Sequence, residues 1–307
     1  MTLPSLSQQV ILITGASAGI GAALAQVLAQ QCSGVRLVLV ARRGDRLEAV
    51  AEGCRNAGAE VLVLPADIAQ PQQAKLLVEK TLSVFERIDA LVNNAGYGQM
   101  GPVELIPTAA VERQFATNVL GPIALIQAVI PVMRRQGGGR IVNISSIGGR
   151  LAFPMGGLYS ASKFALEGLS DALRMELEPF KIRVSVVEPG PVTTEFFAVA
   201  RQQGEVAIAH PEATPYRAAF ANLENLAQQT ASRAWTAEKT ARVVLRALSD
   251  RHPRPRYIAA TGGAVLLFLM TKVLPTRFVD RFWQRFYGID RVMQEWQSHP
   301  RVGDPSG

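Results

Sequence analysis

Short apolar runs recur along the chain and alternate with segments that have a helical pattern of apolar residues. The runs that predict strands are residues 10–14, 35–40, 60–64, 90–92, 140–145, 183–188 and 256–261. Short continuous apolar runs are typical of strands that are buried on both faces of a sheet. The even alternation of strands and helices predicts an α/β fold with a doubly wound, mostly parallel, seven-stranded sheet.

A glycine-rich segment follows the first predicted strand. Gly15, Gly19 and Gly21 stand between that strand and a helical pattern over residues 22–28. Glycines in this context permit a tight turn, close approach of a pyrophosphate, and close packing of helix on strand, while the helix N-terminus attracts phosphates. The segment therefore predicts a dinucleotide site, and a plain glycine turn is the alternative.

A tyrosine and a lysine further along the chain suggest proton transfer. Tyr159 and Lys163 are four residues apart, thirteen residues after Ser146. Residues at this spacing share a helix face, so we expect the ammonium to lie beside the phenol and lower its pKa. The Ser146 hydroxyl could then hold a substrate carbonyl oxygen against that phenol. Taken alone, the pair is more often an exposed helical pair, and only the accompanying motifs argue against that interpretation.

These motifs, in this order, resemble those of the short-chain dehydrogenase/reductase family over about residues 8 to 195, including the segments 93–96 and 189–194. The resemblance implies a Rossmann fold and a nicotinamide cofactor. It implies a catalytic set of Ser146, Tyr159, Lys163 and Asn118, with Asn118 completing a proton relay through water. It also implies cofactor contacts from Gly15, Ser17, Gly19, Ile20, Gly21, Asp67, Asn94, Ala95, Gly96, Tyr159, Lys163, Pro189, Gly190, Val192 and Thr194.

Several of these positions have a purely structural alternative. Asp67 could cap the helix that follows it, and residues 93–96 could form an ordinary turn. Asn118 could be a core amide whose hydrogen bonds are satisfied within the fold. Ser145 competes with Ser146 for the catalytic place, and the spacing to the tyrosine in the family's pattern favours Ser146.

The end of the second predicted strand bears on the choice of cofactor. In this fold an acidic residue there would bind the ribose hydroxyls of NAD, whereas this chain has Ala41 followed by Arg42 and Arg43. Guanidinium groups match phosphate in charge and geometry. We therefore expect NADP(H), with Arg42 and Arg43 at the 2′-phosphate, and a solvated start of a charged helix as the alternative.

The segment between residues 194 and 236 covers the substrate in this family. Here it carries Phe196, Phe197, Tyr216 and Phe220, with few charges aligned for a phosphate, so we expect an apolar ketone, aldehyde or alcohol. The chain is most similar to the hydroxysteroid and retinol dehydrogenase branch. An acyl-thioester 3-ketoreductase, or a non-catalytic dinucleotide-sensing protein on the same fold, are the alternatives.

The C-terminal region departs from the family's minimal pattern. From residue 251 onward nine Lys/Arg face four Asp/Glu, which gives +5 of the formal net charge of +7, with aromatic residues interleaved. The apolar run 258–271 is shorter than the ~20 residues that a membrane span needs, and Gly262 and Gly263 divide it into strand and helix. We expect a dehydrogenase domain over residues 1–262 and a helical extension over 263–307 packed on that domain or on a second subunit of a homo-oligomer. A weak membrane-surface contact is the alternative.

Other classes of function have little support in the sequence. Cys32, Cys54 and the three histidines His210, His252 and His299 have no metal or disulfide spacing. The N-terminal residues resemble no signal peptide, and nothing resembles a module that reads nucleic-acid grooves. We therefore expect a cytoplasmic protein without a metal, a disulfide or a nucleic-acid partner, and a location at the periphery of a membrane is the alternative.

Overall fold

A computed structural model describes residues 4–298 of the chain. Its centre is a parallel sheet of seven strands in the order β3-β2-β1-β4-β5-β6-β9. The strands are β1 Val10–Thr14, β2 Arg36–Ala41, β3 Glu60–Pro65, β4 Ala90–Asn93, β5 Gly139–Ile144, β6 Ile182–Pro189 and β9 Arg256–Ala259. All seven predicted strands are present, with ends that differ by one or two residues from the apolar runs.

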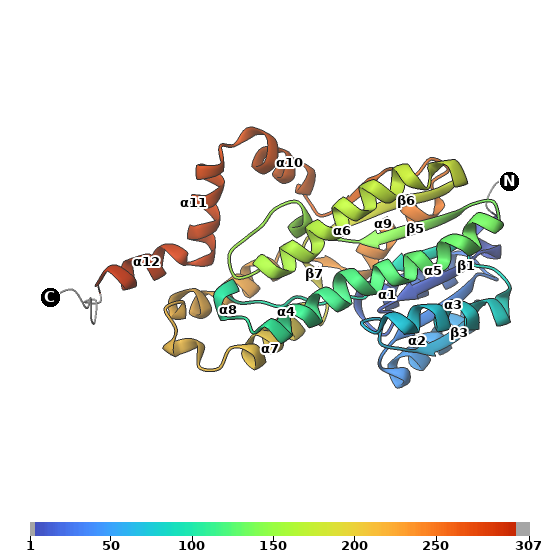
Figure 1. The fold of residues 1–307 in the computed structure, drawn as a ribbon, viewed down its shortest axis with the longest axis horizontal. Helices are drawn as coiled ribbons and strands as arrows, with labels where there is room; N and C mark the ends of the chain where they lie inside the picture. The colour runs from blue at the N-terminus through green and yellow to red at the C-terminus, as the bar shows by residue number, and fades with distance from the viewer. Residues whose placement is uncertain (1–3, 299–307) are drawn as a thin grey trace.

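Helices cover both faces of the sheet (Figure 1). One face carries α1 Gly19–Gln31, α2 Gly44–Asn56 and α9 Ala237–Ser249, which contribute Leu24, Leu47 and Val244 to one core. The other face carries α3 Pro71–Phe85, α5 Gly121–Arg135 and α6 Gly157–Glu176. These helices contribute Leu77, Leu125 and Leu173 to a second core. Two cores on opposite faces explain why every residue of β1 is buried.

The order of the strands determines where a ligand can bind. The chain builds β1, β2 and β3 in one direction from the centre, then returns to add β4, β5, β6 and β9 in the other. The direction in which strands are added therefore reverses between β1 and β4. The loops that follow these two strands run to opposite sides and leave a crevice beyond the carboxyl ends of the strands. Ligands of doubly wound sheets bind in the crevice at this point.

A long apolar helical segment runs from Thr108 to Arg135. It consists of α4 Thr108–Phe115, a π-helical turn Ala116–Leu120, and α5. By length and composition it could cross a membrane, but such a test is also passed by core helices of soluble proteins. Val129 and Met133 of this segment are completely buried in the core beside the sheet, so its apolar character is explained by packing within the fold.

Two further helices lie beyond the carboxyl end of β6. The segment contains β7 Val192–Thr193, α7 Phe196–Ala207, α8 Arg217–Ala231 and β8 Trp235–Thr236. β7 and β8 pair as a second, two-stranded parallel sheet that the sequence pattern did not predict. Strands of two residues are too short to show an alternation of apolar and polar positions.

The C-terminal helices follow one another away from the sheet and are red in Figure 1. They are α10 Gly263–Phe268, a π-helical turn Leu269–Val273, α11 Thr276–Tyr287 and α12 Ile289–Ser298. The predicted division of the apolar run 258–271 into a strand and a helix is confirmed, because β9 ends at Ala259 and Gly262 has a left-handed φ of 68° at the start of α10. His299 and the last part of the expected extension lie outside the described residues.

Candidate active site

The glycine-rich turn forms a closely packed cradle between β1 and α1. Gly15 and Gly19 have left-handed φ values of 67° and 55°. A Cβ atom at Gly21 would lie 2.5 Å from the carbonyl oxygen of Gly15, so only glycine fits there. The N-cap residue of α1, Ala18, makes no side-chain capping bond, and Ser17 and Ile20 belong to the same turn. Free backbone N–H groups and a helix N-terminus suit a pyrophosphate.

Thr14 joins this turn to the loop after β4. Its hydroxyl accepts hydrogen bonds from the backbone N–H groups of Asn94 and Ala95, both at 3.0 Å. The Asn94 side chain in turn donates to the carbonyl oxygen of Thr14 at 2.9 Å. These bonds fix the two loops that border the crevice. The resemblance places Thr14 at the start of the cofactor turn, whereas the sequence pattern did not predict its hydrogen bonds to the loop after β4.

Tyr159 and Lys163 lie on one face of α6, as their spacing predicts. The phenol is 8% exposed, and burial raises the pKa of Tyr159 to about 12, opposed by a hydrogen bond with Ser146. The lysine Nζ lies 5.9 Å from the centroid of the phenol ring and donates to the carbonyl oxygen of Ile144 at 2.8 Å. Burial lowers the pKa of Lys163 to about 8. The expectation that the lysine lowers the phenol pKa is therefore wrong for this structure, because the loss of water around the phenol raises that pKa above its ordinary value.

Ser146 follows β5 and lies on the same side as the phenol. Its Oγ accepts a hydrogen bond from the backbone N–H of Gly148 at 3.0 Å. A Cβ atom at Gly148 would lie 3.3 Å from that Oγ and 3.4 Å from Cε1 of Tyr159, so the serine and the tyrosine border the same small space. The competing Ser145 lies beside Glu167, where its hydroxyl opposes the burial that raises the pKa of that carboxyl group.

Asn118 lies in the π-helical turn between α4 and α5, a type of distortion that is frequent at functional sites. Its side chain donates to the carbonyl oxygen of Tyr97 at 2.9 Å and to Ser162 Oγ at 3.0 Å, and it accepts from the N–H of Tyr97 at 3.1 Å. The amide is therefore well satisfied within the fold. A Cβ atom at Gly96 would lie 3.1 Å from Asn118 Oδ1 and 3.6 Å from Lys163 Nζ, so both groups border the space that this glycine leaves open.

The remaining predicted cofactor residues lie along the same crevice. Pro189 ends β6, Val192 begins β7, and Thr194 follows it. A Cβ atom at Gly19 would lie 3.2 Å from the methyl group of Thr194, so the glycine turn and this loop face each other closely. At Gly190 an added Cβ atom would lie 2.8 Å from the Ala260 side chain, which leaves no room for a larger residue.

Asp67 does not cap a helix. Its Oδ1 accepts a hydrogen bond from the backbone N–H of Ala69 at 3.0 Å, which closes a local turn after β3. The next helix, α3, begins at Pro71 with Gln70 as its N-cap, and no side chain caps it. The capping alternative for Asp67 is therefore wrong.

The two arginines after β2 have different surroundings. Arg43 lies 3.4 Å from the carboxylate of Glu195, and Arg46 lies 2.8 Å from the same carboxylate. Both arginine side chains are 46% exposed, so these ion pairs are at the surface. Arg42 is exposed and forms no ion pair with any residue between 4 and 298. The structure thus leaves Arg42 available to an anion and places an acidic competitor beside Arg43.

Aromatic side chains lie against the phenol and near it. Phe196, at the start of α7, packs edge-on against Tyr159 with ring centroids 5.4 Å apart. A Cβ atom at Gly148 would lie 3.1 Å from the Phe153 ring, which stacks on Tyr287 of α11. The predicted covering segment thus contributes Phe196, but the sequence pattern missed the contribution of the C-terminal helix. The spacing of Trp283 and Tyr287, four residues apart, was the only local signal.

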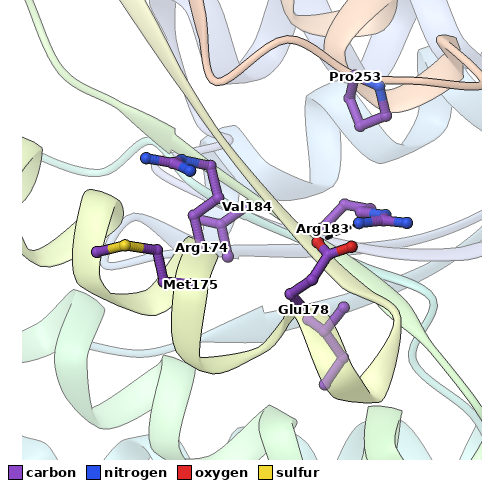
Figure 2. A pocket seen from close by; sticks show the side chains of 7 residues that line it. Arg174, Met175, Glu178, Arg183, Val184 and Pro253 are labelled. Carbon is purple, nitrogen blue, oxygen red and sulfur yellow. Dashed lines mark hydrogen bonds and ion pairs between the residues drawn. The ribbon is translucent and has the colours of Figure 1, made fainter.

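A surface hollow lies well away from this site. Figure 2 shows Arg174 and Met175 of α6 beside the beginning of β6, where Arg183 forms an ion pair with Glu178. The hollow is at the amino end of β6, whereas Pro189 at its carboxyl end borders the crevice. An eight-residue strand separates the two by about 23 Å. The hollow therefore belongs to the opposite edge of the sheet.

The comparisons with known proteins agree with this geometry. A family model described as short chain dehydrogenase matches residues 9–205. The chain is 41% identical over 191 residues to a 3-ketodihydrosphingosine reductase from Bacteroides thetaiotaomicron, an alignment that covers 62% of this chain and 66% of that protein. It is 33% identical over 268 residues to human 17-beta-hydroxysteroid dehydrogenase type 1, covering 85% of this chain and 80% of that protein.

Solved structures show the same fold. A short chain dehydrogenase/reductase from Burkholderia phymatum in complex with NAD has a TM-score of 0.77 and 27% identity, covering 87% of this chain and 94% of that chain. A metagenomic short-chain oxidoreductase in complex with NADP has a TM-score of 0.66 and 30% identity, covering 84% of this chain and all of that chain. The two neighbours thus differ in the cofactor that their descriptions name.

Proposed function

The chain belongs to the short-chain dehydrogenase family, and we propose that it is an NADP(H)-dependent enzyme that interconverts an apolar ketone or aldehyde with the corresponding alcohol. The observation that carries the proposal is the convergence of Tyr159, Ser146 and Lys163 at the carboxyl ends of the strands, next to a cradle that only glycines can form. The cofactor, when bound, supplies or accepts the hydride. The residues of the chain position the carbonyl group and move the proton.

Tyr159 is the proton donor in the reductive direction. With a pKa of about 12, its phenol keeps its proton at neutral pH, as a general acid must. Ser146 borders the same space and donates a hydrogen bond to the carbonyl oxygen that receives the proton. Phe196 packs against the phenol ring and limits the access of water to it.

Lys163 and Asn118 connect the phenol to its proton supply. The pKa of Lys163, about 8, allows this amine to gain and lose a proton near neutrality. Asn118 Oδ1 and Lys163 Nζ both border the space at Gly96, where a water molecule can bridge them. Because Asn118 is held by three hydrogen bonds, it provides a fixed acceptor for that water.

The preference for NADP(H) rests on the residues after β2. Ala41 replaces the carboxylate that would bind ribose hydroxyls and repel a 2′-phosphate. Arg42 has no ion-pair partner among residues 4–298 and is the primary phosphate ligand. Arg43 contributes once the phosphate displaces Glu195 from it.

The substrate class follows from the walls of the site. Phe196 packs against the phenol, and Phe153, stacked on Tyr287, lies near the same small space at Gly148, which favours an apolar substrate. The names of the two curated relatives, a ketone reductase and a hydroxysteroid dehydrogenase, agree with this class. Trp283 Nε1 is buried and has no hydrogen-bond partner in the described part of the chain, so it can donate to a second polar group of the substrate.

A substrate panel tests the proposal. Hydrophobic ketones, aldehydes and alcohols are incubated with the protein and either NADPH or NADP, and nicotinamide absorbance is recorded. A 3-ketoacyl thioester is included, because turnover of that compound alone would favour an acyl-thioester ketoreductase. Cofactor binding without turnover of any compound would instead favour a dinucleotide-sensing role.

A further inference from the structure

The outer face of the C-terminal helices is unusually apolar. Nine of the 18 large hydrophobic side chains that are exposed among residues 4–298 lie between residues 265 and 296. Six of them fall within fourteen positions, namely Val265, Phe268, Leu269, Val273, Leu274 and Phe278. These six, on α10, the π-helical turn and the start of α11, are called the arm surface below. Isolated exposed apolar residues are ordinary, but a concentration of this kind marks an interaction site.

Helix α11 presents two faces of different character. Its inner face packs on the domain through Trp283, Phe286 and Tyr287, and the Asn222 side chain of α8 donates to the carbonyl oxygen of Phe286 at 3.0 Å. Another edge continues the arm surface through Phe278 and Phe282, which are 62% and 44% exposed. Helix α11 therefore packs on the domain with one face and exposes apolar side chains on another.

A row of arginines lies on the outside of the same helix. Arg277, Arg281 and Arg285 follow one another at intervals of four residues, so they share one face. All three are exposed, and none forms an ion pair with a described side chain, that is, one in 4–298 other than those of residues 224 and 227. The only acidic residue of α11 is Asp280, so three arginines face one carboxylate on this helix. The helix thus carries a net positive charge of +2 beside exposed phenylalanines.

The exposed apolar side chains and the row of arginines together indicate what binds to the arm surface. An interfacial helix places its apolar side chains in the acyl boundary and its arginines among anionic headgroups. Unpaired arginines beside an apolar row are complementary to that arrangement. We propose that the arm surface docks the protein on an anionic lipid bilayer. The inference goes beyond the proposed function, since docking requires no turnover.

The arm surface lies next to a helix that borders the proposed active site. The inner face of α11 supplies Tyr287, which stacks on Phe153 at the catalytic crevice, with ring planes 7° apart. A single helix therefore touches the bilayer on one side and the wall of the active site on the other. This arrangement brings the crevice within one helix diameter, about 10 Å, of the lipid surface, from which an apolar ketone or alcohol can enter.

Co-sedimentation with vesicles tests the docking. The intact chain is mixed with vesicles of phosphatidylcholine and phosphatidylglycerol, and separately with phosphatidylcholine alone. We expect binding to the anionic vesicles that is released by high salt. Replacing the three arginines with glutamine (R277Q, R281Q, R285Q) should weaken binding by roughly 100-fold, since each cation near such a surface contributes about a five-fold gain.

An apolar variant and a matched control separate docking from other causes. The double variant Phe268→Ser with Phe278→Ser should weaken vesicle binding by more than about ten-fold. The control, Val84→Ser with Met175→Ser, changes residues that are 55% and 64% exposed but lie on α3 and α6, and should bind as the unaltered chain does. Circular dichroism and thermal unfolding verify that each variant is folded.

Three results would overturn the proposal. The intact chain could fail to bind anionic vesicles, or the Phe268 and Phe278 variant could bind as well as the control. Sedimentation velocity could also show an oligomer that dissociates in that variant without any vesicle binding, which would assign the arm surface to a second copy of the chain. Turnover of a water-soluble ketone should be the same in all variants, so a failure of the proposed enzymatic function is recognised separately.

Discussion

Phe153 and Tyr287 stack with ring centroids 5.4 Å apart and ring planes 7° apart, although 134 positions separate them in the chain. Phe153 lies in the loop between β5 and α6, near the space that Tyr159 also borders, and Tyr287 ends α11. The pair makes the C-terminal helix part of the wall of the proposed active site. Burial in this cluster also raises the pKa of the Tyr287 phenol.

Loss of this stacking should affect large substrates most. Tyr287→Ala removes a half-buried ring from the crevice wall, so we expect kcat/KM to fall by about ten-fold or more for a multi-ring ketone and to change little for a short one. Steady-state kinetics with NADPH measure both. Phe278→Ala, on the exposed edge of the same helix, is the matched control and should leave both values unchanged. An equal loss for both substrates would contradict the assigned place of Tyr287.

The proton donor can be tested with a minimal change. Tyr159→Phe removes only the hydroxyl group and keeps the ring that packs on Phe196. Turnover should fall by about 10²- to 10⁴-fold, as expected for loss of a general acid, while cofactor binding and the melting temperature are retained. Nicotinamide absorbance and thermal unfolding are the measurements. Near-normal turnover would show that another group donates the proton.

The buried amine should make stability depend on pH. Folding lowers the pKa of Lys163 from 10.5 to about 8, so between these values the unfolded chain binds more protons than the folded chain. The free energy of unfolding should therefore rise with pH across this window, by up to about 3 kcal/mol, and this gain is lost as the pH falls through 8. Urea unfolding from pH 7 to 9.5 measures the rise. In Lys163→Met the rise should largely disappear, and an unchanged slope would refute the assignment.

Cofactor preference should depend on the two arginines in different ways. Arg42→Ala should weaken NADPH binding by about 10- to 100-fold and leave NADH binding unchanged, because a charge-assisted hydrogen bond contributes roughly 1.5–3 kcal/mol. Glu195→Gln should strengthen NADPH binding, since it releases Arg43 from a competing carboxylate. Fluorescence titration of both cofactors measures these changes. Equal affinities of the unaltered chain for NADH and NADPH would argue against the proposed specificity.

The need for glycine in the cradle can be tested by comparing Gly21→Ala with an alanine substitution at an exposed helical glycine. In Gly21→Ala the added Cβ atom would lie 2.5 Å from a backbone oxygen, so we expect lower stability and loss of cofactor binding. In Gly53→Ala the added Cβ atom meets nothing within 4 Å in the interior of α2. That control should bind the cofactor normally and gain about 0.5–1 kcal/mol of stability. Comparable cofactor binding by the two variants would contradict the close approach inferred at Gly21.

The sequence by itself determined the sheet and the shared helix face of the tyrosine and the lysine. Continuous apolar runs predicted seven strands because burial on both faces leaves no polar alternation, and these strands are present. The spacing of Tyr159 and Lys163 predicted a shared helix face, and both lie on α6. Such features depend on residues within one or two turns of each other, and local backbone geometry fixes them.

Only the tertiary structure decided the pKa values of those groups and which distant residues pack around them. The pKa of Tyr159 rises because the folded chain removes water from around it, which no local spacing records. Glu195 forms a hydrogen bond with Arg43, which is 152 positions away in the chain. Tyr287 stacks on Phe153, which is 134 positions away. These contacts follow from the order of the strands and from where the last helices pack. Residues that are distant in sequence meet only after the sheet is assembled, so local patterns of apolar and polar residues do not specify their contacts.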